Sequence, residues 1–219
     1  MSRKKVTLET GEMYHVYNRG VDKRTVFQDA EDYLRFYKSL DYFNSVEPVT
    51  SYFEANRKRK SGNRHHQERL VDIHAYCLLP NHFHILLTQK ADSGVSEFMR
   101  RVGGGYTSYF NEKNSREGTL FQGVYKRAHV DSDTKLLHLA AYVNLNYTVH
   151  GFRNIHEVYK TSHVVYEGKK DCDFLETSMI LDQFEGRSGY IKNAPRHCRY
   201  IFEQRAAEKN PNPNADLLE

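Results

Sequence analysis

The 219-residue sequence contains no tryptophan, only three cysteines and no long apolar run. Cys77, Cys172 and Cys198 lie far apart and form no paired spacing, which argues against a disulfide framework or a zinc ribbon. No segment approaches the roughly 20 apolar residues that a membrane-spanning helix requires. The N-terminal residues are polar and lack the apolar region of a secretory signal, so we expect a cytoplasmic protein with no membrane partner.

Composition sets the size of the fold and hints at its partner. Hydrophobic residues make up 39% of the chain, enough for one large domain, or for a domain with an appendage. The net charge is only +4, but the positive residues are clustered, at 57–60, 100–101 and 126–127. Such clusters are typical of nucleic-acid binders, although a solvated loop surface is the ordinary interpretation. The 16 tyrosines could stack on unpaired bases, but most of them must pack in the core.

Apolar periodicity predicts an alternation of strands and helices. The segment 45–68 is polar and basic, and we expect a long loop with at most a short helical piece. Because Pro80 and Asn81 separate two strand-like runs, these runs should form an antiparallel hairpin. The expected strands are 13–18, 71–78, 82–88 and 124–130, and the expected helices are 30–43, 94–114 and 134–146.

Two histidines occur on the second strand of that hairpin. Successive side chains of a strand point to opposite faces, so His82 and His84 should share one face about 7 Å apart, with Phe83 on the other. This arrangement can present two neutral nitrogens to one divalent metal. The alternative is a solvated sheet surface with no site.

Three consecutive glycines, at 103–105, interrupt the apolar pattern of the predicted helix 94–114. Each costs about 1 kcal/mol relative to alanine in a helix, so we expect a break or a close approach of another segment. A phosphate-binding loop is the other possibility, but the spacing matches no nucleotide-binding fingerprint. Beyond a main domain expected for 1–150, we predict a helical extension over 151–208 and a disordered tail over 209–219.

The predicted helix 134–146 carries His138, Tyr142 and Asn146 at every fourth position, beside its buried stripe. A tyrosine can act as a nucleophile toward phosphorus, and an asparagine carbonyl oxygen is a suitable ligand for Mg²⁺ or Mn²⁺. The structural alternative is a tyrosine at the edge of the core and an asparagine that ends the helix. His138 and His129 are weak candidates for a general base and more plausible as structural residues.

Four segments in this order resemble the motifs of the single-tyrosine HUH transposases, in the branch of IS200-like enzymes associated with repetitive extragenic palindromes (REP). The segments are Leu79–His84, Tyr106–Asn111, Gly118–Lys126 and Tyr142–Asn146. The resemblance spans about residues 10–150. Two features depart from the family: Tyr147 stands where many relatives have proline, and the basic segment 45–68 is longer than usual.

The resemblance implies an α+β fold of the ferredoxin-like or RRM-like type, with an antiparallel sheet backed by helices; the C-terminal helical appendage is expected from the pattern after residue 151. It also implies that His82, His84 and Asn146 bind Mg²⁺ or Mn²⁺ and that Tyr142 is the nucleophile. The implied reaction cleaves and transfers single-stranded DNA beside a hairpin, through a covalent 5′-phosphotyrosine. A homodimer that shares its sites is possible within the family.

Recognition of the DNA would depend on basic residues outside the catalytic set. The candidates are Arg19, Lys23, Arg24, Arg57, Lys58, Arg59, Lys60, Lys126 and Arg127. The main alternative function is a domesticated protein on the same scaffold that binds a nucleic-acid hairpin without cutting it. A hydrolytic phosphodiesterase is less consistent with the sequence, because such enzymes need two His-x-Thr/Ser units and the chain has no such pair.

Overall fold

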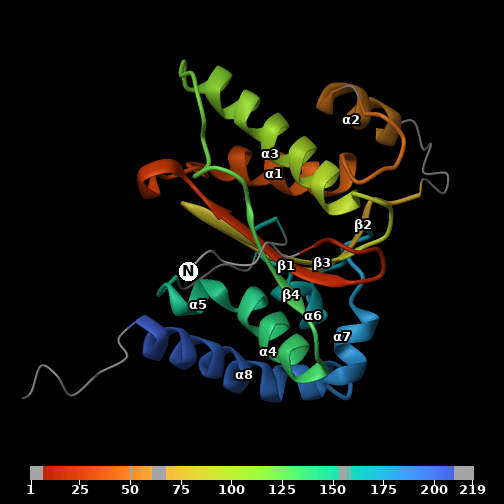
Figure 1. Ribbon diagram of the computed structural model, residues 1–219, viewed down its shortest axis with the longest axis vertical. Helices are drawn as coiled ribbons and strands as arrows, with labels where there is room; N and C mark the ends of the chain where they lie inside the picture. Colours follow the sequence, from red (N-terminus) through yellow and green to blue (C-terminus); the bar gives the residue numbers. More distant parts are fainter. Residues whose placement is uncertain (1–6, 50, 61–67, 153–156, 158, 210–219) are drawn as a thin grey trace, which may run out of the picture.

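Four strands form one antiparallel sheet in the order β2-β3-β1-β4 (Figure 1). The computed structural model describes residues 7–49, 51–60, 68–152, 157 and 159–209. The strands are β1 (Met13–Arg19), β2 (Val71–Leu79), β3 (His82–Gln89) and β4 (Lys126–Val130). The β2–β3 hairpin turns at Pro80 and Asn81, as expected, and β1 pairs with both β3 and β4.

Helices cover both faces of this sheet. Figure 1 shows α1, α2 and α3 on one side and α4 to α8 on the other. The architecture is therefore the predicted α+β fold, an antiparallel sheet backed by helices. The helices are η1 (Val21–Lys23), α1 (Ala30–Tyr42), α2 (Tyr52–Lys60), α3 (Gly94–Lys113), α4 (Asp133–Asn144), α5 (Asn146–Val149), α6 (His163–Tyr166), α7 (Ser178–Gln183) and α8 (Gly186–Lys209).

The strand alternation of β3 divides the protein into two apolar cores. Phe83 and Ile85 point toward α1 and α3, where they join a cluster that includes Phe36 and Phe98. Leu86 points to the other face and belongs to the cluster formed with α4 and α8. Because β1 and β3 are the two central strands, most of their side chains are buried under helices on one face or the other.

The second core depends on the C-terminal part of the chain. Val143 of α4 packs in the same buried cluster as Tyr190, Ala194 and Cys198 of α8. The segment 151–208, where the sequence predicts a helical extension, contains the six-residue α7 and nearly all of the 24-residue α8. Of the predicted tail, residues 210–219 lie outside the described residues. Among the helices that the structure describes, none is long and apolar enough to cross a membrane.

Two expected features differ from the structure. The helix α3 continues through Gly103–Gly105, so the predicted break is wrong and the close approach is confirmed at Gly105. The nine-residue α2 in the segment 45–68 agrees with the short helical piece that the sequence allows there. The helix predicted to end at Asn146 ends at Asn144, because Leu145 leaves helical geometry (φ −101°, ψ 11°) before the chain begins the short α5.

The neighbouring Gly104 and Gly105 should respond in opposite ways to alanine. A Cβ on Gly104 has no heavy atom within 4 Å, whereas one on Gly105 meets Phe43 Cε2 at 2.9 Å. We expect Gly104→Ala to raise the free energy of unfolding by about 1 kcal/mol, through helix propensity. In Gly105→Ala, overpacking against Phe43 costs about 1–3 kcal/mol and outweighs that gain. Urea denaturation of both variants tests this; equal stabilisation would contradict the close packing.

Candidate active site

The register of the sheet places the two predicted histidine ligands on the face covered by α4. His84 lies opposite Tyr17 of β1, and His82 lies opposite Arg19. On the other side of β1, Tyr17 lies opposite Lys126 of β4. Cross-strand partners share one face of a sheet, so these five side chains belong to one surface. The sheet itself therefore brings an aromatic ring and two cations next to the histidine pair.

The structure holds His82 in the neutral form that binds metals. Its Nδ1 lies 2.6 Å from the Oδ1 of Asn81, and because a carboxamide oxygen only accepts, Nδ1 donates and Nε2 carries the lone pair. The pKa of His82 is lowered to about 4, mainly by burial. Charge repulsion from His150 and Arg19 also lowers this pKa, whereas the contact with Asn146 raises it. A neutral imidazole with a defined lone pair is the metal-binding state of histidine.

Asn146 supplies an oxygen that faces this lone pair. Its Oδ1 lies 3.4 Å from His82 Nε2, its side chain is fully buried, and its Nδ2 has no hydrogen-bond partner among the described residues. With the amide in this orientation two acceptors face each other, which a cation between them would satisfy. Two ligand atoms at right angles, each about 2.1 Å from a metal, are about 3 Å apart. The His82 and Asn146 atoms therefore fit a divalent cation.

The three predicted ligands of the candidate metal site carry no negative charge. Within the described ranges, no group of three or more His, Cys, Asp and Glu side chains is placed to hold a metal. His82, His84 and Asn146 are all uncharged ligands, and Mg²⁺ or Mn²⁺ prefers oxygen. A cation here would need further oxygen ligands, which waters and the phosphate of a nucleic acid can supply.

Tyr142 reaches this site from α4. Its ring lies edge-on to His84, with centroids 5.7 Å apart, and edge-on to His15, at 6.4 Å. The side chain is only 5% exposed, more buried than the edge-of-core position expected from the sequence. His84 and Tyr142 come from elements that are distant in the chain, so the fold is what places the candidate nucleophile beside a candidate ligand.

The two other histidines considered as bases lie elsewhere. His138 contacts His197 of α8 through their Nδ1 atoms at 3.1 Å and stacks on Tyr200 at 4.2 Å. His129 Nε2 lies 2.5 Å from a carboxylate oxygen of Glu12. Both histidines make contacts that connect structural elements.

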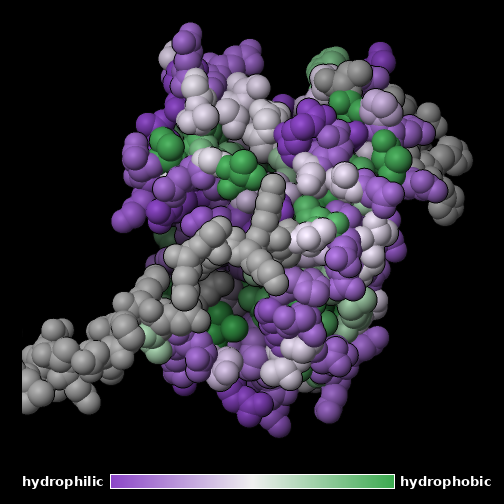
Figure 2. Space-filling model, viewed as in Figure 1, coloured by the Kyte–Doolittle hydropathy of each residue, from purple (hydrophilic) through white to green (hydrophobic). Residues whose placement is uncertain are grey.

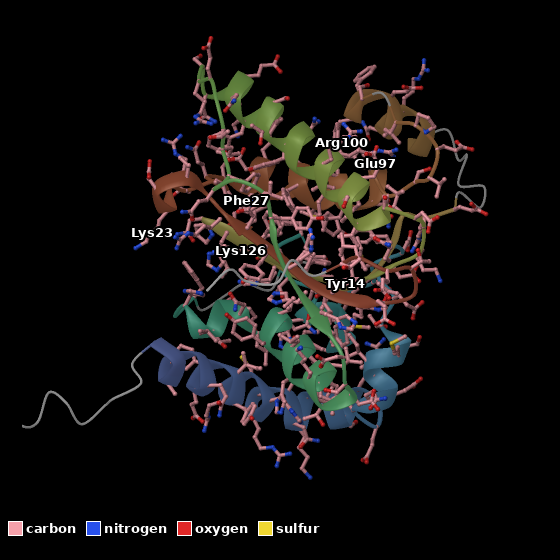
Figure 3. All side chains as sticks on the ribbon, viewed as in Figure 1. Tyr14, Lys23, Phe27, Glu97, Arg100 and Lys126 are labelled. Atoms are coloured by element: carbon pink, nitrogen blue, oxygen red, sulfur yellow. The ribbon has the colours of Figure 1, made fainter. Side chains whose placement is uncertain are left out.

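The predicted DNA-contacting residues fall into two groups. Near the histidines, Arg19 is exposed and its Nε donates to Gln122 Oε1 at 2.6 Å, and Lys126 is exposed on the same face. Lys23 and Arg24 follow β1, and Figure 3 shows Lys23 and Lys126 at the same end of the sheet.

The second group lies away from the histidines. Arg127 is opposite Val16, so it points to the face of α1 and α3. Arg57 and the backbone of 58–60 belong to α2, which is on that same side of the sheet (Figure 1). The side chains of Lys58, Arg59 and Lys60 lie outside the described residues. The structure therefore does not bring the basic segment of α2 to the candidate active site.

A cavity of about 910 Å³ lies on the α3 side of the sheet, through the sheet from the histidines. Its lining includes Phe83, Gly104, Phe121, Val124 and Arg127. Val124 is 78% exposed, and Figure 2 shows other hydrophobic side chains at the surface among hydrophilic ones. This cavity is separate from the surface that carries His82 and His84.

Two residues of β1 at the site were not predicted from the sequence. His15 is fully buried and its Nε2 lies 2.8 Å from His84 Nδ1, and the ring of Tyr17 stacks on both imidazoles. The alternation of the run 13–19 predicts that His15 and Tyr17 share one face of a strand. The sequence alone does not show that this strand pairs with β3, and it is this pairing that brings the two residues to the histidine pair.

An antiparallel sheet with a histidine pair on a central strand, and a tyrosine from a covering helix beside it, defines an α+β protein with a candidate catalytic surface. Residues 51–146 match the model of a family described as "Transposase IS200 like". The matched range contains His82, His84 and Tyr142 and ends at Asn146. The resemblance to this family that the sequence motifs indicate is confirmed over this range.

A solved structure shares the fold. The chain is similar to the protein in the "Structure of the REP associates tyrosine transposase bound to a REP hairpin", with a TM-score of 0.50 and 13% sequence identity. The similarity covers 80% of this chain and 98% of that one. At this identity the comparison establishes the fold. No protein among those with curated descriptions matches the chain.

Proposed function

We propose that this protein is a metal-dependent single-stranded DNA transferase that cleaves beside a hairpin and forms a 5′-phosphotyrosine at Tyr142. The observation that carries the proposal is the convergence of Tyr142 with His84 and of Asn146 with His82 on one face of the sheet. The family match and the sequence motifs support the same reaction class. Because Tyr142 faces His84 of its own chain, one copy of the protein supplies the complete set.

His82, His84 and Asn146 would hold Mg²⁺ or Mn²⁺. When bound, such an ion polarises the scissile phosphate and stabilises the charge that develops as the bond breaks. The protein contributes orientation: Asn81 fixes the His82 ring, and α5 fixes Asn146 opposite it. Burial keeps His82 neutral near pH 7, where its lone pair is available.

Tyr142 would attack the phosphorus in line with the 3′ oxygen of the preceding nucleotide. The bond between the phenolic oxygen and phosphorus forms, the bond from phosphorus to the 3′ oxygen breaks, and the leaving oxygen takes up a proton. The phenolic proton is lost in the same step. The energy of the broken bond is retained in the phosphotyrosine, so attack by another 3′-hydroxyl rejoins the strand without ATP.

A DNA hairpin is the proposed substrate. The protein of the similar solved structure is bound to a REP hairpin, and this supports the same kind of nucleic acid here. Arg19 and Lys126 flank the histidines on one face, where they can contact the phosphates next to the cleaved bond. Lys23 and Arg24 extend this positive surface at the same end of the sheet.

The direct test is covalent adduct formation. The protein is incubated with Mn²⁺ or Mg²⁺ and labelled single-stranded hairpins, including flanks of its own genomic locus, and the products are separated by denaturing electrophoresis. We expect a labelled protein–DNA adduct that disappears with chelator. Hairpin binding with no adduct in either metal would contradict the proposal and favour the non-cleaving binder.

Arg19→Gln and Lys126→Gln should weaken hairpin binding, and most strongly at low salt. For a single strand, the logarithm of the binding constant falls linearly with the logarithm of the salt concentration. Each lost phosphate contact should make this slope shallower by about 0.7. Arg57→Gln is the matched control, because Arg57 lies on α2 away from the histidines. Fluorescence anisotropy over a salt series measures all three variants. An equal loss of slope in Arg57→Gln would show that the strand follows a different surface.

A further inference from the structure

We propose that His15 is a positioning residue for the metal site, and that it fixes the tautomer and the ring orientation of His84. The inference rests on the proposed function, because it concerns the role of His84 as a ligand. Nothing in the sequence motifs points to His15, and the family match, which begins at residue 51, does not include it.

The contact between the two imidazoles is an in-line hydrogen bond. His15 Nε2 lies 2.8 Å from His84 Nδ1, and the ring planes differ by only 19°. The ring centroids are 5.0 Å apart, close to the largest separation that a 2.8 Å contact between ring nitrogens permits. The lone pair of one ring therefore points along the N–H of the other, and the two nitrogens share one proton.

The direction of this hydrogen bond decides whether His84 can bind a cation. Since Nδ1 is engaged by His15, His84 would bind a metal through Nε2, which must then lack a proton. A neutral imidazole carries one proton, so this proton must lie on Nδ1 and be donated to His15 Nε2. The opposite direction places the proton on His84 Nε2 and blocks coordination.

The two proposed histidine ligands are held in the same way. Asn81 engages Nδ1 of His82, and His15 engages Nδ1 of His84, so Nε2 is the outward nitrogen of both. Such partners typically orient metal-binding histidines and raise their affinity for the metal. His82 is held by a residue of the hairpin turn, whereas His84 depends on the neighbouring strand.

The position of His15 makes it rigid. Its side chain is fully buried, and β1 is paired along its length with β3 and over Met13–Tyr17 with β4. Tyr17 stacks on His15 at 5.0 Å and on His84 at 5.5 Å, so the three rings limit one another. A polar side chain buried at this point of the sheet would be costly without a hydrogen-bonded role.

The first test measures metal affinity without DNA. Isothermal titration with Mn²⁺ compares the wild type with His15→Phe, which keeps a flat ring but no acceptor, and with His15→Gln, which keeps an acceptor near the Nε2 position. We expect about 10–100-fold weaker binding in His15→Phe, the usual effect of losing such a partner, and a partial recovery in His15→Gln. His74→Phe is the matched control, because His74 is also buried in the sheet but bonds to Thr88 and Glu176.

Four outcomes separate the inference from the proposed function. Absence of Mn²⁺ binding in the wild type, or unchanged binding in His84→Ala, would overturn both. If His84→Ala loses binding and His15→Phe binds like the wild type, only the role of His15 is overturned. Should His15→Phe fail to fold, nitrogen-15 NMR of the imidazoles in the metal-free wild type decides: a proton on His84 Nδ1 supports the proposal, and a proton on Nε2 overturns it.

Discussion

Tyr142→Phe is expected to abolish the covalent protein–DNA adduct completely. The substitution removes only the phenolic oxygen, and no other atom of that ring can bond to phosphorus. The ring itself remains edge-on to His84 and His15, so the fold and the metal affinity should not change. The adduct is measured by denaturing electrophoresis, and hairpin binding by anisotropy; we expect no adduct and binding within about twofold of the wild type, because no phosphate contact is removed.

Tyr17→Phe is the matched control for this prediction. Tyr17 also packs against His84, with ring centroids 5.5 Å apart, but it comes from the sheet and not from α4. We expect this variant to keep forming the adduct. Adduct formation by Tyr142→Phe at the wild-type level would exclude Tyr142 as the nucleophile. Loss of the adduct in Tyr17→Phe but not in Tyr142→Phe would indicate that Tyr17 of β1 is the nucleophile.

The largest expected effect on stability comes from Lys113→Met. The Lys113 ammonium at the end of α3 donates to Asp32 Oδ1 and to Asp29 Oδ2, both at 2.8 Å. Asp32 is fully buried, and Asp29 caps the N-terminus of α1. Removal of the cation leaves a buried carboxylate without its counter-charge, which should lower the free energy of unfolding by about 3 kcal/mol. Chemical denaturation at pH 7 measures this loss.

The pH dependence of that loss provides a second check. The hydrogen bond from Lys113 lowers the pKa of Asp29, so the stability it contributes is present above the ordinary carboxylate range and is lost as the pH falls through the lowered value. The part of the difference between Lys113→Met and wild type that comes from Asp29 should therefore shrink in acid. Lys135→Met is the control, because its pair with Asp131 is exposed to solvent and should contribute little to stability. Equal losses in both variants would contradict the account.

Local patterns predicted the histidine face and most of the elements. The strict alternation of 82–88 was sufficient to place His82 and His84 together, and the tight turn at Pro80 identified the hairpin. Helical spacing located α1, α3 and α4 to within two residues of their observed ends. These features depend on interactions between residues that are near in sequence, which is the information a periodicity contains.

Long-range pairing could not be predicted in the same way. The contact of His15 with His84 joins residues 69 positions apart and follows from the order of strands in the sheet. The position of the basic residues has the same origin: Lys126 and Arg127 are neighbours in sequence but point to opposite faces of β4. The continuation of α3 through Gly105 also needed knowledge of Phe43, which packs against that glycine.

The most direct test of the central claim is to identify the residue to which the DNA becomes covalently attached. The adduct formed with Mn²⁺ is digested with nuclease and trypsin, and the modified peptide is sequenced by mass spectrometry. The account predicts a nucleotide attached through its 5′ phosphate to the oxygen of Tyr142. Attachment to Tyr17, to Tyr147 or to any other residue would contradict it.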